Sequence, residues 1–249
     1  MRILLTNDDG IEAPGFRELA VAILELGHDL VVAAPARQLS GASASILIDN
    51  DSPQVEVRPH DLGIDGLEAR AVGAAPAMCV LLAIHGRFGA RPELVVSGPN
   101  HGANAGRVVL HSGTVGAALT AGANGIRGLA VSLDVGLVPT GYHWNAAART
   151  AAGLLELAAA QPAGAVLNLN VPNRAEPAEL VEAPLDPAGI VHTTTTEDDD
   201  EDSVRLALAS ATGRSVADSD ADLLARGFAT LTRLAPVSAL PLEPPLPHP

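Results

Sequence analysis

The chain has 249 residues, with 29 Asp and Glu residues against 15 basic ones, for a formal net charge of −14. All 15 basic residues are arginines, and the absence of lysine excludes Schiff-base chemistry and a P-loop, which both need that side chain. An acidic chain without a basic cluster is also a poor candidate for binding a nucleic-acid duplex or an anionic membrane, so neither is expected as a partner.

The composition indicates a globular protein with an aliphatic core. Hydrophobic residues make up 47% of the chain and charged residues 18%, whereas aromatic residues make up only 2%, so Ala, Val, Leu and Ile must fill the interior. The single Cys79 excludes an intrachain disulfide framework and fits a reducing compartment. No uncharged apolar run reaches the roughly 18 residues of a membrane helix, and no targeting segment is visible. We therefore expect a soluble, cytoplasmic protein.

Hydrophobic patterning predicts alternating strands and helices over the first two thirds of the chain. Residues 2–6 and 30–34 are continuous apolar runs, typical of strands buried on both faces, and a helix with one apolar stripe is expected between them over 14–26. The two strands of such a unit are parallel, with a right-handed crossover. The further elements expected here are strands at 54–58, 68–72, 94–97, 129–133 and 166–171, and helices at 76–85, 112–123 and 142–159. This order predicts an α/β fold with a doubly wound, mostly parallel, Rossmann-like sheet.

Beyond Pro172 this alternation ends. We expect residues 1–174 to form the catalytic core and residues 175–249 to form a β-rich C-terminal arm of the same domain. The residues from Glu197 to Asp202 are a run of six acidic side chains, for which a solvated loop is the simplest interpretation and weak cation capture the alternative. The elements expected in the arm are strands at 204–209 and 228–234, a short helix at 220–226, and a proline-rich tail from Pro236.

The sequence Thr6-Asn-Asp-Asp-Gly10 directly follows the first predicted strand. In open parallel sheets the carboxyl ends of the strands form the ligand crevice, so Asn7, Asp8 and Asp9 are expected to face a site. Two adjacent carboxylates repel each other unless a cation or a proton lies between them. A hard divalent metal such as Mg²⁺ or Mn²⁺ prefers oxygen ligands and suits this pair. The alternative is a turn in which the Asp side chains cap the next helix.

Two further polar loops follow predicted strands. Ser40, Gly41 and Ser43 can contact a phosphate through hydroxyl and backbone N–H groups, although an ordinary surface loop has the same composition. Asn100 and Asn104 lie among glycines, which implies that the backbone approaches a ligand closely. The Asn100 side chain offers an amide oxygen to a metal or an NH₂ group to a phosphate.

A helix is expected to begin at Ser112-Gly113-Thr114, where free N–H groups and the helix dipole can bind an anion. Ser112 can equally be an ordinary N-cap, and the two roles are compatible. Four polar loops at the ends of predicted parallel strands together predict a site for a divalent metal and a phosphate.

These motifs resemble the signature segments of the SurE survival-protein family. The segments that carry the resemblance are residues 1–15, 40–43, 97–106 and 112–118, and residues 167–173 and 218–227 also resemble later segments of the family. The resemblance implies a metal-dependent 5′/3′-nucleotidase that hydrolyses nucleoside monophosphates and binds one divalent ion per subunit, Mn²⁺ or Mg²⁺, with Ca²⁺ as a substitute in crystals. It also implies a homodimer or homotetramer assembled through C-terminal arms.

The resemblance assigns the site residue by residue. Metal ligands fall on Asp8, Asp9, Ser40 and Asn100, and substrate or phosphate contacts fall on Asn7, Gly41, Ser43, Asn104, Ser112, Gly113 and Thr114. The chain departs from the family pattern at Ala44, Ala75 and Met78, where polar residues are usual, and at His111, where an aromatic residue is usual. These departures affect substrate preference and fine geometry more than the core reaction.

The expected chemistry is hydrolysis of a phosphate monoester, with Asp8 or Asp9 as the proton acceptor from water. His101 and His111 flank the loops and could act as acid or phosphate partner, or serve only packing or the surface. A haloacid-dehalogenase-type phosphatase with an Asp nucleophile would need Asp-x-Asp and a lysine, and a phosphoacceptor receiver domain would also need a lysine and a shorter chain. A non-catalytic nucleotide-binding protein stays open.

Overall fold

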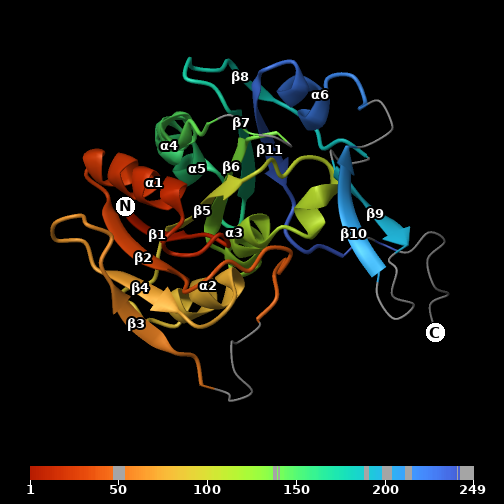
Figure 1. Cartoon of the computed structure of the whole chain (residues 1–249). Coiled ribbons are helices and arrows are strands. Elements are labelled where there is room, and N and C mark those ends of the chain that lie inside the picture. Colours follow the sequence, from red (N-terminus) through yellow and green to blue (C-terminus); the bar gives the residue numbers. More distant parts are fainter. Residues whose placement is uncertain are drawn as a thin grey trace, which may run out of the picture.

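The computed structural model describes residues 1–46, 54–136, 139, 141–187, 191–197, 204–210, 215–239 and 241. Within these ranges, nine strands form one sheet in the order β3-β4-β2-β1-β5-β6-β7-β11-β8, and β9 and β10 form a separate two-stranded sheet (Figure 1). The strands are β1 (Arg2–Thr6), β2 (Asp29–Pro35), β3 (Val57–His60), β4 (Ala69–Val72), β5 (Leu94–His101), β6 (Arg127–Asp134), β7 (Val166–Pro172), β8 (Leu180–Glu182), β9 (Val191–Glu197), β10 (Val204–Ser210) and β11 (Ala229–Leu234). The helices are α1 (Pro14–Glu25), α2 (Pro76–Ile84), α3 (Gly113–Ala123), α4 (Trp144–Gly153), α5 (Leu155–Ala160) and α6 (Asp220–Ala225), with a short 3₁₀ helix η1 (Arg107–Leu110).

The order of the central strands places a ligand crevice between β1 and β5. β1 pairs in parallel with β2 on one side and with β5 on the other, and β4, β6 and β7 continue the parallel pairing outward. The chain therefore winds outward in one direction through β2 and β4 and in the other through β5, β6 and β7. In doubly wound sheets, such a switch point opens a crevice at the carboxyl ends of the strands. The predicted fold class is confirmed. Within the described part of the large sheet, β3 pairs antiparallel with β4 and β11 pairs antiparallel with β7, whereas β8 runs parallel to β11.

Helices cover both faces of the sheet, and successive residues of β1 point to opposite cores. Ile3 and Leu5 pack with the buried side chains of α1, α4 and α5, whereas Leu4 packs with those of α2 and α3. This alternation is the period of two that any strand imposes. It explains why β1 is apolar throughout, as expected of a strand buried on both faces.

The small residues of α3 let this helix lie close to the sheet. Eight of its eleven residues are buried, and most of them are Gly or Ala. A Cβ atom added to Gly128 of β6 would lie 2.6 Å from the Ala118 carbonyl oxygen, so the helix backbone rests almost directly on the strand. An aliphatic core with few aromatic rings therefore brings the start of α3 up to the crevice.

Several predicted elements differ in extent from those observed: the strand expected at 54–58 is β3 at Val57–His60, and the strand expected at 129–133 is β6 at Arg127–Asp134. The helix expected over 142–159 is two helices, α4 and α5, which break at Leu154. Gly153 is the physical reason, since glycine gains no side-chain packing and loses the most backbone freedom in a helix. β5 continues to His101 instead of stopping at Ser97, because a shift in register between Ser97 and Asn100 lets the strand keep pairing with β6.

The C-terminal region contributes to the main sheet. β11 pairs with β7 and β8 pairs with β11, so strands from beyond residue 175 extend the large sheet, while β9 and β10 stand apart as a hairpin (Figure 1). The strands expected at 204–209 and 228–234 are present as β10 and β11, whereas β8 and β9 were not predicted. Of the acidic run, only Glu197 lies within the described residues, and most of the proline-rich tail lies outside them. Among the described helices, none is long and apolar enough to cross a membrane.

Candidate active site

Side chains from four loops meet in a cleft of about 510 Å³ at the carboxyl ends of the central strands. The loops follow β1, β2 and β5 or begin α3, as the strand-end argument predicted. The predicted site residues that line the cleft are Asp8, Asp9, Ser40, Gly41, Asn100, Asn104 and Ser112. Asn7, Ser43, Gly113 and Thr114 are not among the lining residues, and each instead contacts the loops or side chains that form the cleft, as described below.

Asp8 lies against the first turn of α3. The Thr114 hydroxyl donates a hydrogen bond to Asp8 Oδ1, and only 4% of Asp8 is exposed. A Cβ atom on Gly113 would lie 2.8 Å from both Cβ and Oδ2 of Asp8, so no larger residue fits at that position. Burial, which outweighs the Thr114 hydrogen bond, raises the pKa of Asp8 to about 6, and the nearby charge of Asp9 adds to the rise. A cation beside this carboxylate would reverse that shift.

Asp9 is held by two donors from other loops. The His101 backbone N–H donates to Oδ2 at 2.9 Å, and Gln38 Nε2 donates to Oδ1 at 3.1 Å. Gln38 Nε2 also lies 2.9 Å from Ser40 Oγ, so one side chain connects Asp9 with the serine loop. Burial raises the pKa of Asp9, and the hydrogen bond from His101 opposes that rise.

The oxygen atoms of this group fit a hard divalent cation. Asn100 Nδ2 donates to the Gly102 carbonyl at 2.8 Å, which leaves the amide oxygen available to the cleft. With the carboxylates of Asp8 and Asp9 and the Ser40 hydroxyl, the donors are all oxygens, as Mg²⁺ and Mn²⁺ prefer. No cluster of three or more His, Cys, Asp or Glu side chains suited to a metal occurs in the described part of the chain. The group would therefore combine two carboxylates with neutral oxygens.

The serine loop rests on α3 through a close backbone contact. A Cβ atom on Gly116 would lie 2.2 Å from the Ser43 carbonyl oxygen. Ser43 Oγ donates to the Leu110 carbonyl at 2.7 Å, so this hydroxyl is used within the protein. Ser112 Oγ accepts a hydrogen bond from the Val115 N–H at 3.1 Å and is the N-cap of α3, while still lining the cleft. The two roles expected for Ser112 are thus compatible in space.

Asn104 is part of a buried amide network. Its Nδ2 donates to Ser132 Oγ at 2.9 Å, its N–H donates to Asn170 Oδ1 at 2.7 Å, and Asn168 Nδ2 donates to its carbonyl at 2.7 Å. These bonds fix the loop after β5 onto β6 and β7. Asn7 has a similar part in the first loop, where its Nδ2 donates to the Gly10 carbonyl at 2.8 Å and holds the turn.

The C-terminal region also secures the cleft. Asp220, at the start of α6, accepts a hydrogen bond from the Gly106 N–H at 2.9 Å and another from the Asp186 N–H at 2.7 Å. Burial raises the pKa of Asp220. Asp220 thereby holds Gly106, which lies more than 110 positions earlier in the chain, and with it the loop that carries Asn100 and Asn104.

Sequence reasoning missed several residues at the cleft. Asp134 ends β6 and lines the cleft, and burial raises the pKa of its carboxylate. The strand-end rule that found Asp8 would also have found Asp134, because the strand expected at 129–133 stops one residue earlier. Gln38 belongs to no motif that would have marked it as a site residue. Tyr142 and Trp144 pack against His101 and could have been noticed only as the single Tyr and single Trp of the chain.

Comparisons with known proteins agree with this geometry. The sequence matches the family model described as survival protein SurE over residues 3–196. It is 40% identical over 175 residues to a protein named 5′-nucleotidase SurE from Geobacter metallireducens, covering 70% of this chain and 65% of that relative. A protein of the same name from Xanthomonas campestris pv. campestris is 40% identical over 177 residues, with the same coverage. The chain thus spans slightly less than two thirds of the length of these relatives.

A solved structure supports the fold. The crystal structure of the SurE protein from Aquifex aeolicus superimposes with a TM-score of 0.76 and 23% sequence identity, covering 96% of this chain and 95% of that one. The doubly wound architecture and the resemblance seen in the opening motif are both confirmed.

Proposed function

The chain belongs to the SurE survival-protein family, and we propose that it is a divalent-metal-dependent phosphomonoesterase that hydrolyses nucleoside monophosphates, at the 5′ or the 3′ position. The observation that carries the proposal is the contact of Asp8 with Gly113 and Thr114, which joins an acidic pair to a helix N-terminus. The name 5′-nucleotidase of the relatives supports the same reaction.

Asp8, Asp9, Ser40 and Asn100 would hold the cation, for which Mn²⁺ and Mg²⁺ are the candidates. When bound, such an ion supplies Lewis-acid polarisation of a phosphoryl oxygen and lowers the pKa of a water molecule. The acidic pair fits that role, because burial of Asp8 beside Asp9 disfavours two negative charges without a counterion.

The start of α3 would bind the phosphate. The N–H groups of the first turn have no partners inside the helix, and the helix dipole favours an anion at this end. Ser112 and Gly41 line the cleft beside them. Because the chain has no lysine, backbone N–H groups would meet much of the phosphate charge that a lysine meets elsewhere.

Hydrolysis requires a proton acceptor next to these groups. Asp8 or Asp9 would accept the proton of the attacking water as its oxygen bonds to phosphorus. As the bond from phosphorus to the ester oxygen breaks, that oxygen takes up a proton, which the protonated Asp returns directly or through water, and leaves as the nucleoside hydroxyl. The donors from His101 and Gln38 keep the Asp9 carboxylate in one orientation throughout.

Self-association through the C-terminal arm belongs to the proposal. β9 and β10 pair only with each other among the described strands, and an isolated two-stranded hairpin is marginally stable in water. A second copy of the chain would supply the packing, in a homodimer or homotetramer. Light scattering after size exclusion should give twice or four times the 25.3 kDa of the chain.

We also place the protein in the cytoplasm, where a buried free thiol at Cys79 is stable.

The test of the reaction is phosphate release from nucleoside 5′- and 3′-monophosphates with Mn²⁺ or Mg²⁺. We expect release that EDTA abolishes and that added metal restores. Metal-loaded protein that binds nucleotides but releases no phosphate would identify a non-catalytic binding protein instead. A trapped aspartyl-phosphate would point to a covalent Asp mechanism and would contradict direct attack by water.

A further inference from the structure

The single Tyr and the single Trp of this chain lie together beside the cleft. The Tyr142 and Trp144 rings are stacked, with centroids 5.6 Å apart and planes at 17°. The His101 ring lies 5.3 Å from the Tyr142 ring and 6.1 Å from the Trp144 ring. We call His101, Tyr142 and Trp144 the aromatic shelf. In a chain with 2% aromatic residues, three rings gathered at one place need an explanation.

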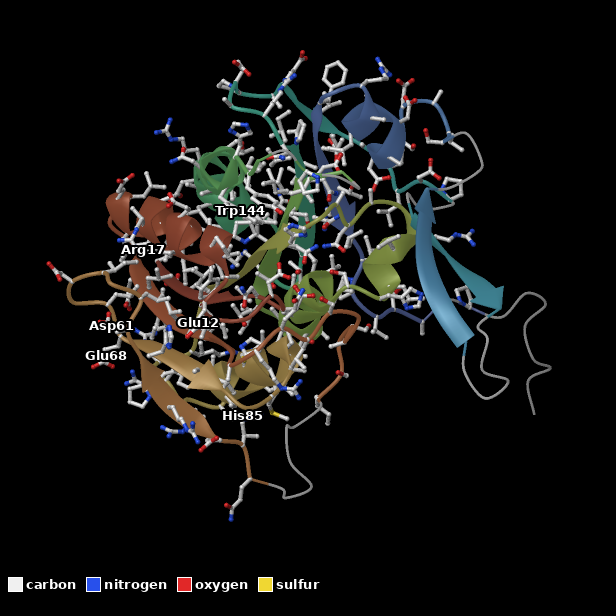
Figure 2. All side chains as sticks on the ribbon, in the orientation of Figure 1. Glu12, Arg17, Asp61, Glu68, His85 and Trp144 are labelled. Carbon is white, nitrogen blue, oxygen red and sulfur yellow. The ribbon has the colours of Figure 1, made fainter. Side chains whose placement is uncertain are left out.

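The shelf has a rigid base. Trp144 lies flat on α1, where a Cβ atom on Gly15 would come within 2.4 Å of the indole ring (Figure 2 labels Trp144 beside α1). Asn173 holds the segment on both sides of Tyr142, since its Nδ2 donates to the Gly141 carbonyl at 2.7 Å and its Oδ1 accepts from the His143 N–H at 2.8 Å. Gly15 under the Trp144 ring and the two hydrogen bonds of Asn173 beside Tyr142 therefore fix the positions of both rings.

The shelf remains accessible despite this support. Tyr142 is 49% exposed, and Tyr142 and Trp144 line a cavity of about 500 Å³. A tyrosine that served only the core would be covered on both faces. Here one face is against Trp144 and much of the rest is open.

The shelf adjoins the acidic pair. The His101 ring contacts Tyr142 and Trp144, while the backbone N–H of the same residue donates to Asp9 at 2.9 Å. His101 also lines the main cleft, and the two rings that it contacts line the other cavity. A ligand that places a phosphate at the start of α3 can therefore direct an attached aromatic group toward these rings.

We propose that the aromatic shelf binds the base of the nucleoside monophosphate by stacking on Tyr142. The inference rests on the proposed function for the phosphate end of the substrate. Aromatic rings stack on every nucleobase, because each base has a π face, so the shelf accepts purines and pyrimidines and selects nucleotides over sugar phosphates. Phosphate esters without an aromatic group lose this contact.

The test compares wild type, Tyr142→Ala and Tyr142→Phe, which retains the ring. Trp144 is the only tryptophan, so its fluorescence reports the shelf without any need for metal or turnover. Adenosine should change the Trp144 emission saturably in wild type and Tyr142→Phe but not in Tyr142→Ala, and ribose 5-phosphate should not change it. With Mn²⁺, the ratio of kcat/KM for AMP to kcat/KM for ribose 5-phosphate should fall by about tenfold in Tyr142→Ala, equivalent to about 1.4 kcal/mol.

The outcomes separate the shelf from the reaction. Saturable adenosine binding that persists in Tyr142→Ala, or an unchanged substrate ratio in an active enzyme, overturns the shelf and leaves the reaction standing. Adenosine binding that needs the Tyr142 ring, in protein that releases no phosphate from either substrate, supports the shelf and overturns the reaction. Emission that changes with protein concentration but not with adenosine shows that a second copy covers the rings, and this overturns the proposal.

Discussion

Asp8 and Gly113 are in direct contact: a Cβ atom at residue 113 would lie 2.8 Å from the Asp8 side chain. This contact brings the end of β1 and the start of α3 together, although the two residues are more than 100 positions apart in the chain. It places an acidic side chain where backbone N–H groups also converge. The first prediction follows from this contact.

Gly113→Ala should separate α3 from Asp8 and lower phosphate release by about 100-fold, since a displacement of about 1 Å at reacting groups has that effect. The free energy of unfolding should fall by roughly 1–3 kcal/mol, the usual cost of overpacking. Gly153→Ala is the matched control, because an added Cβ atom there meets no atom within 4 Å. That control should keep full activity and gain up to about 1 kcal/mol of stability. Equal activity of the two variants would contradict the prediction.

Asp8→Asn should reduce turnover of nucleoside monophosphates by roughly three orders of magnitude or more, because it removes the charge of a proposed metal ligand and a candidate proton acceptor. Steady-state kinetics at saturating Mn²⁺ measures the loss, and circular dichroism checks that the fold survives. Turnover within tenfold of wild type would remove Asp8 from the metal site.

Although Asp8→Asn should reduce turnover, it should raise the stability of the metal-free protein. The pKa of Asp8 is about 6 in the folded chain against an ordinary 3.8, so the folded state holds this proton more tightly than the unfolded state. Ionisation therefore destabilises the fold as the pH rises from about 4 to above 6. Asp8→Asn should be more stable than wild type above pH 6, by at most about 3 kcal/mol, with the gain vanishing near pH 4. Urea unfolding in EDTA at both pH values tests the sign, and a gain that grows toward acid would reverse it.

Gln38→Leu should weaken the proposed metal binding by about 10- to 100-fold, the usual effect of losing a residue that orients a metal ligand. Gln38 connects Asp9 with Ser40, so its loss releases two of the expected ligands together. Titration of Mn²⁺ against activity and by calorimetry measures the change. The control is Gln161→Leu, since Gln161 lies outside the cleft and its side chain donates to the nearby Leu157 carbonyl. An unchanged affinity in Gln38→Leu would leave Gln38 without a role at the site.

The sequence by itself determined the doubly wound, mostly parallel class of the sheet and the position of the acidic pair. Apolar runs set the strands, and polar residues after such runs must lie at the carboxyl edge of a parallel sheet, so Asp8, Asp9, Ser40 and Asn100 could be placed at one cleft before any coordinates. These inferences need only the local period of a strand and the common direction of its neighbours.

The tertiary structure decided which of these polar groups stay available. Asn104 and Ser43 belong to the motifs, yet the Asn104 side-chain amide donates a hydrogen bond to Ser132, and the Ser43 hydroxyl donates one to the Leu110 carbonyl. The Trp144 ring, on which Tyr142 stacks, packs against Gly15, which lies more than 120 residues earlier in the chain. Local patterns could not reveal such contacts, because a side chain's hydrogen-bond partner or packing neighbour depends on which distant segment folding brings beside it.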